Sequence, residues 1–84
     1  MDKNIQELFV KKFWKEESIW FYIHFQNEEA IRQIEISSKG KVFLTLENPQ
    51  QGESMLYDQS IEELDLQDSD FIPKEEFEGT WNDQ

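Results

Sequence analysis

His24 is the single histidine of the chain, and the sequence contains no cysteine. A zinc site needs several nitrogen or sulfur ligands, and no second histidine or cysteine is present to supply them. The neighbours Ile23 and Phe25 should point to the opposite face of a strand from His24. We therefore expect His24 to be a packed strand residue beside Trp20 and Tyr22, with neither a metal nor a catalytic role.

Carboxylates are the other abundant chemical groups. Glycosidase or acid–base chemistry needs two carboxylates in different environments, one of them shielded from water. The chain has four pairs of adjacent glutamates. The two side chains of such a pair point in different directions, and most of the pairs fall in expected turns or first helical turns, so we interpret them as solvated. Residues 65–76 lack the glycine of a calcium loop, and three glycines in the whole chain cannot build a glycine-rich phosphate loop. The sequence therefore predicts no enzyme, no cofactor and no metal. The adjacent pairs are Glu16-Glu17, Glu28-Glu29, Glu62-Glu63 and Glu75-Glu76.

The net charge of −11 is unevenly distributed along the chain. Residues 1–46 contain seven acids and seven bases, whereas residues 47–84 contain twelve acids and one base, Lys74. A field of one sign attracts a partner of opposite sign and speeds encounter, and a negative one repels nucleic acid and anionic lipid. Acidity kept for solubility is the alternative. The candidate partner-binding acids are Glu47, Glu53, Asp58, Glu62, Glu63, Asp65, Asp68 and Asp70.

Four segments alternate apolar and polar residues with the period of a β-strand: 8–15, 18–26, 30–37 and 41–47. Short turns join them, and Gly40 marks the clearest hairpin turn. Together they predict an antiparallel meander. In the third segment Ile34 and Ile36 alternate with Gln33 and Glu35, which predicts that one side of this strand is solvated.

The rest of the chain predicts short elements. Residues 55–57 would add an edge strand, and Ser60 with Glu63 matches a capping box that starts a helix near Ile61. Pro73 suits the first turn of a last helix, which carries Phe77 and Trp81 on one face. We expect a single acidic α+β domain over residues 1–84: a four- to five-stranded antiparallel meander sheet with one or two short C-terminal helices packed on one face.

Aromatic residues of the first two strands form a second candidate surface. If the helices cover the face bearing Ile19, Phe21, Ile23 and Phe25, the aromatic set lies on the opposite face. An exposed aromatic patch bordered by charge is typical of a protein-binding hot spot, while packing under a loop or in a homodimer is the alternative. The sequence leaves open whether the acidic or the aromatic surface makes the contact. The aromatic set is Trp14, Trp20, Tyr22 and His24.

No apolar stretch approaches the length of a membrane span. The first residues lack the basic start and apolar run of a signal peptide, and the absence of cysteine fits a reducing compartment. We therefore expect a cytoplasmic protein.

A set of apolar, acidic and glycine positions spans most of the chain: Trp14, Glu17, Tyr22, 32–36, Gly40, Met55, Leu56 and 72–81. With this set the chain resembles a family of small bacterial domains of uncharacterised function, many encoded among polymorphic-toxin and immunity genes. The resemblance implies an immunity-like protein that neutralises a toxin. A nuclease toxin has a basic, phosphate-binding cleft, which an acidic inhibitor can occupy with carboxylates in place of phosphates.

Two other functions remain compatible with the residues. The chain could be a nucleic-acid-mimicking inhibitor of a DNA-binding host protein, because the same acids would serve. It could also be a non-enzymatic accessory or oligomerisation module, including a homodimer formed through the aromatic set.

Overall fold

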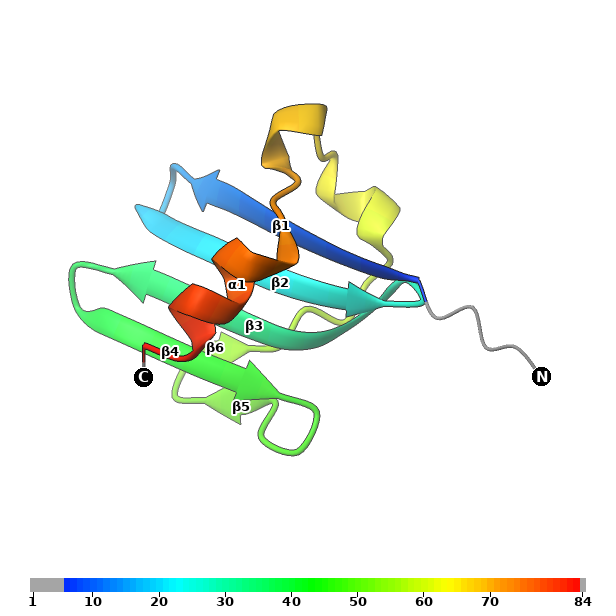
Figure 1. Ribbon diagram of the computed structural model, residues 1–84. Coiled ribbons are helices and arrows are strands. Elements are labelled where there is room, and N and C mark those ends of the chain that lie inside the picture. The colour runs from blue at the N-terminus through cyan, green and yellow to red at the C-terminus, as the bar shows by residue number, and fades with distance from the viewer. Residues whose placement is uncertain (1–5, 84) are drawn as a thin grey trace.

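The computed structural model describes residues 6–83; the residues before them, which bear on a targeting signal, lie outside the described part. Four strands pair in chain order as an antiparallel meander, which confirms the predicted α+β class (Figure 1). Alternating β-branched and aromatic side chains suit such a pleated sheet, because successive residues point to opposite faces. The strands are β1 (Glu7–Trp14), β2 (Ile19–Gln26), β3 (Glu29–Ser37) and β4 (Gly40–Thr45).

The turn between β2 and β3 is a two-residue hairpin turn. Asn27 and Glu28 both have positive φ, 52° and 73°, as a type I′ turn requires. Asn27 also exchanges hydrogen bonds with Gln6: its N–H donates to the Gln6 carbonyl at 2.8 Å, and its Oδ1 accepts from the Gln6 N–H at 3.1 Å. The turn thereby holds Glu28 and Glu29 at one end of the sheet.

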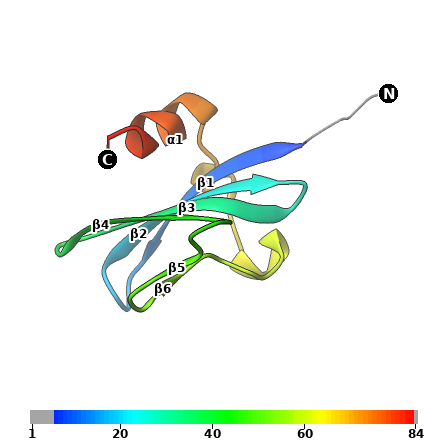
Figure 2. The same cartoon turned by 90° about the horizontal axis from the view of Figure 1, so that it is seen from below.

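The sheet is covered on both of its faces (Figure 2). The helix α1 (Lys74–Trp81) lies on the face that carries Phe9 and Ile34, which we call the helix face, and its Phe77 is fully buried there. The helix therefore does not cover the face of Phe21 and Phe25, which was the condition for an aromatic set opposite the helix. Both faces of β2 are apolar, so the alternation alone did not reveal which of them the helix covers.

The segment between β4 and α1 covers the other face, which we call the segment face. It contains a two-stranded hairpin followed by the first of two 3-10 helices, and the hairpin is a separate small sheet rather than a fifth strand of the meander. Its Leu56 closes a core with Val10, Ile23, Phe25 and Leu44 of the sheet. The elements are β5 (Gln50–Gln51), β6 (Ser54–Met55) and η1 (Ile61–Leu64).

The predicted solvated side of β3 is buried instead. Gln33 and Glu35 are only 2% and 8% exposed, because β6 and the residues after it lie over them. Gln33 Nε2 donates to the Met55 carbonyl at 3.1 Å and to Glu35 at 2.8 Å, and Gln33 Oε1 accepts from the Tyr57 N–H at 2.8 Å. Ser54 Oγ donates to the second oxygen of Glu35 at 2.8 Å. These bonds satisfy polar groups that would otherwise be costly to bury.

The capping box predicted at Ser60 does not form. Ser60 makes no side-chain hydrogen bond to η1, which ends at Asp65 in the left-handed region, φ 54°. A capping box is found instead at the second 3-10 helix, η2 (Asp68–Asp70), where the Gln67 N–H donates to Asp70 Oδ2 at 2.9 Å. The left-handed residue directly after Leu64, Asp65, ends this turn after four residues, so the segment does not continue into an α-helix.

Replacing Phe77 with alanine should lower the free energy of unfolding by about 3–5 kcal/mol, because the ring is fully buried and its loss leaves a cavity. Glu75→Ala is the matched control on an exposed position of the same helix, and it should change the value by about 0.5 kcal/mol or less. Urea unfolding followed by tryptophan fluorescence measures both. A loss of less than about 1 kcal/mol for F77A would contradict the packing of α1 on the sheet.

Candidate protein-interaction surface

The bases of the sheet are paired with acids from the end of the chain. Within the described residues, four ion pairs involve lysine or arginine, and each joins a base of the first half to an acid of residues 70–83. These acids therefore hold η2 and α1 against the sheet and present less uncompensated charge to a partner. The pairs and their N–O distances are Lys11–Glu76 at 3.3 Å, Lys12–Asp70 at 3.7 Å, Arg32–Glu78 at 2.6 Å and Lys41–Asp83 at 2.7 Å.

Residues 47–68, which we call the acidic segment, are different. They contain seven of the eight predicted acids and no lysine or arginine. All seven are exposed, and none is in an ion pair with a lysine or arginine of the part of the chain that the structure describes. The eighth predicted acid, Asp70, is half-buried and paired with Lys12. The negative charge of the acidic segment is therefore directed at solvent.

Sequence reasoning missed two acids that belong beside the acidic segment. Glu28 and Glu29 lie in the electrically balanced first half, but the hairpin turn brings them next to Asp58. The three acids line one surface hollow of about 470 Å³, and its lining includes no lysine or arginine. The signal in the sequence was the Glu-Glu pair at a turn, but only the folded sheet shows which end of the molecule that turn reaches.

The four residues of the aromatic set do not share one face. Trp14 pairs with Ile19 and lies on the segment face, whereas Trp20 pairs with Phe13 and lies on the helix face with Tyr22 and His24. The expectation of one aromatic patch opposite the helix is therefore wrong. The β1–β2 turn places Trp14 opposite Ile19 rather than opposite Trp20. Because successive residues of a strand point to opposite faces, Trp14 lies on the other face from Trp20, Tyr22 and His24.

Two exposed aromatic sites result. Trp20 packs against Phe13 with ring centroids 5.0 Å apart, and the Lys11 ammonium lies 5.1 Å from the Trp20 ring centroid. On the segment face, Trp14 lines a hollow of about 510 Å³ together with Glu63. The structure thus brings one predicted aromatic and one predicted acid together, while Trp20 stays on the far face of the sheet.

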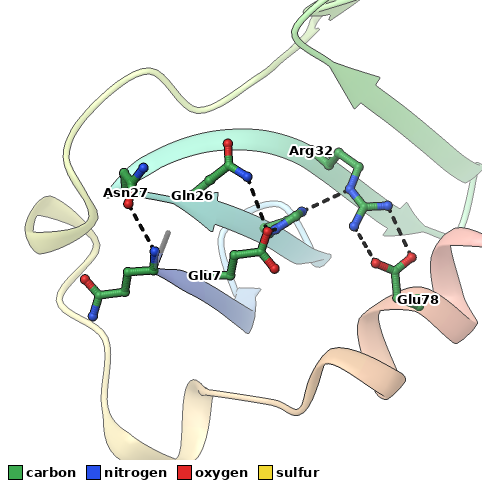
Figure 3. A network of polar contacts seen from close by, with 7 residues as sticks. Glu7, Gln26, Asn27, Arg32 and Glu78 are labelled. Carbon is green, nitrogen blue, oxygen red and sulfur yellow. Dashed lines mark hydrogen bonds and ion pairs between the residues drawn. The ribbon is translucent and has the colours of Figure 1, made fainter. Parts of the chain in front are cut away.

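His24 is a packed strand residue, as expected, and it is buried beneath α1. Its ring stacks on Phe9 with centroids 4.3 Å apart, and its Nδ1 accepts a hydrogen bond from Arg32 Nε at 3.0 Å. Figure 3 shows Arg32 extending from β3 to Glu78 on α1, with Glu7 of β1 nearby. Arg32 donates to both oxygens of Glu78, at 2.6 and 3.3 Å. A partner has no direct access to the ring, so we leave His24 out of the interaction surface.

The charges around His24 determine its protonation. Burial, and then the Arg32 guanidinium, lower the pKa of His24 below its ordinary 6.5, against the opposing influence of Glu7 and Glu78. Since Nδ1 accepts from Arg32, the neutral ring carries its proton on Nε2, which faces Glu7 Oε2 at 3.6 Å. The bonds from Arg32 also lower the pKa of Glu78. These contacts connect β1, β2 and β3 of the sheet with α1.

Within the described residues, no group of three or more histidine, cysteine, aspartate or glutamate side chains is placed to hold a metal ion. In the same part of the chain, no helix has the length and apolar character needed to cross a membrane.

No family model, no curated protein and no solved structure matches this chain. The resemblance to toxin-immunity domains therefore stays a prediction.

The free energy of unfolding should fall as the pH drops from about 7 to about 5.5, above the range where most carboxyl groups titrate. Because the pKa of His24 is lowered in the folded protein, the unfolded chain takes up the proton first, and each step of acidification favours it. Urea unfolding at each pH measures the slope, and a nuclear magnetic resonance titration of the ring protons gives the midpoint.

His24→Asn is the control, since it keeps an acceptor for Arg32 but cannot titrate, and it should remove most of the slope. A ring midpoint above 6.5 would show instead that Glu7 and Glu78 outweigh burial and Arg32.

Proposed function

We propose that this protein is a non-enzymatic inhibitor of the immunity type that binds a basic bacterial toxin, a nuclease, through its acidic segment. The observation that carries the proposal is the run of exposed acids at 47–68, which has no base of its own and no ion pair to a described lysine or arginine. Nucleases bind phosphate with lysine and arginine, so carboxylates can occupy the same positions through charge-assisted hydrogen bonds. The resemblance to immunity-associated domains supports the same target class.

The way the acidic segment is held also supports binding. Gln33 fixes the backbone at Met55 and Tyr57, and Tyr57 donates from its hydroxyl to the Ser60 carbonyl at 2.8 Å. A segment that is already ordered loses less conformational freedom when a partner binds, so more of the electrostatic attraction is available as affinity. The acids therefore act as a preformed surface rather than as a loose tail.

The charge of the acidic segment should set the rate of association. Replacing Glu62, Glu63 and Asp68 with lysine should slow association with the toxin by about tenfold or more, because steering depends on the summed field. Asp65 is left unchanged, since its φ of 54° favours aspartate over lysine. Surface plasmon resonance against the protein encoded beside this chain measures the rate.

The matched control makes the same change of charge outside the acidic segment, at Glu16, Glu17 and Glu75. It should slow association far less, and raising ionic strength from about 0.1 M to about 1 M should abolish the difference as the screening length falls from about 10 Å to about 3 Å. Equal effects of the two triple variants would argue for net charge alone. A neighbouring gene of metabolic type, with no inhibition of any nuclease, would refute the immunity role.

A further inference from the structure

The hollow beside Asp58 has an apolar floor. It lies between the β2–β3 turn and the acidic segment, and we call it the apolar groove. Two of its lining residues, Leu46 and Met55, are 56% and 57% exposed, the highest values among the large hydrophobic residues that the structure describes. Covering leucine and methionine side chains that are this open to water stabilises a complex, and the flexible methionine side chain adapts to the shape of the partner.

The rim of the apolar groove is negative. Glu28 and Glu29 line it from the β2–β3 turn and Asp58 from the acidic segment, while no base lines it. All three acids are exposed, and none is in an ion pair with a described lysine or arginine. A second copy of this chain would bring like charges together here, so the rim disfavours self-association and favours a cationic occupant.

We propose that the apolar groove binds a segment of the partner in which arginine alternates with aliphatic residues. The aliphatic side chains, with the stems of the arginines, cover Leu46 and Met55, and the guanidinium groups reach Glu28, Glu29 and Asp58. Arginine suits this site because its stem packs on apolar surface while its planar head pairs with carboxylates and is weakly hydrated. The inference rests on the proposed function, because it locates on this chain the contact with the basic partner.

Two capped peptides of equal charge test the proposal without the native partner: Arg-Leu-Arg-Leu-Arg and Arg-Ser-Arg-Ser-Arg. In a nitrogen-15 chemical-shift titration of the full chain, the leucine peptide should move the amide signals of residues 28–30, 46 and 55–60. It should bind about tenfold more tightly than the serine peptide, because the partial burial of two leucine side chains accounts for a difference of that size. Binding of both peptides with equal strength, or shifts spread over the whole acidic segment, would overturn the proposal.

Variants separate the floor from the rim. Leu46→Ser with Met55→Ser should reduce the affinity for the leucine peptide to that for the serine peptide, while Phe13→Ser, an exposed apolar position on the helix face, should leave the ratio unchanged. Glu28→Gln with Asp58→Asn should weaken both peptides more than Glu16→Gln with Glu75→Gln does. If either control acts as strongly as its test variant, the groove is not the site.

The experiments also distinguish a failure of the groove proposal from a failure of the proposed function. Loss of toxin binding in the Glu62, Glu63 and Asp68 variant with no peptide in the groove would refute only the groove. Peptide binding in the groove by a chain that inhibits no nuclease would refute only the immunity role.

Discussion

The side-chain amide of Gln33 holds the position of the acidic segment relative to the sheet. It donates to the Met55 carbonyl and accepts from the Tyr57 N–H, as a neighbouring strand would, although it projects from the face of β3. Leucine at this position would leave two partly buried backbone groups without these partners, and the cost approaches about 1–3 kcal/mol for a group that water does not reach. Because the backbone of the acidic segment is held at residues 55–57, the hairpin before these residues and η1 after them are positioned relative to the sheet. Together with the buried Leu56 and the bond from Ser54 to Glu35, these two bonds hold the acidic segment on the sheet beside the apolar groove.

The two faces of the sheet use charge in different ways. On the helix face, Arg32 lies 4.9 Å from the ring centroids of both Phe77 and Trp81, and its fork is occupied by Glu78 and His24. Arg32 and Glu78 are both partly buried, so water competes less with their ion pair than it would at a fully exposed position. On the segment face, the buried polar side chains form the Gln33 and Glu35 cluster, Lys12 pairs with Asp70, and the acids of the acidic segment are left to solvent. The helix face is therefore closed by ion pairs within the fold, and, among the described residues, the segment face presents unpaired charge outward.

This division gives the total charge of −11 a more specific meaning. Asp70, Glu76, Glu78 and Asp83 neutralise bases of the sheet, so the end of the chain contributes less to an external field than its composition suggests. The uncompensated charge of the second half then falls mainly on the acidic segment, and the β2–β3 turn adds two acids to its edge. A cationic partner would meet carboxylates beside exposed apolar side chains, which provides both long-range attraction and short-range burial.

The sequence by itself determined the four strands, their order and the last helix, because period-two alternation, Gly40 and the Pro73 start are local signals that tertiary contacts did not override. It also determined that the acids fall late in the chain. Only the tertiary structure decided which face each element covers. Both sides of β2 are apolar, so the sequence could not tell that α1 would lie on Phe9 and Ile34. Gln33 and Glu35 had the pattern of a solvated face, and they are buried because distant residues supply their hydrogen bonds: the backbone of Met55 and Tyr57 bonds to Gln33, and Ser54 Oγ donates to Glu35. Glu28 and Asp58 line one hollow for a related reason: the proximity of residues far apart in the chain depends on how the layers pack, which no local spacing encodes.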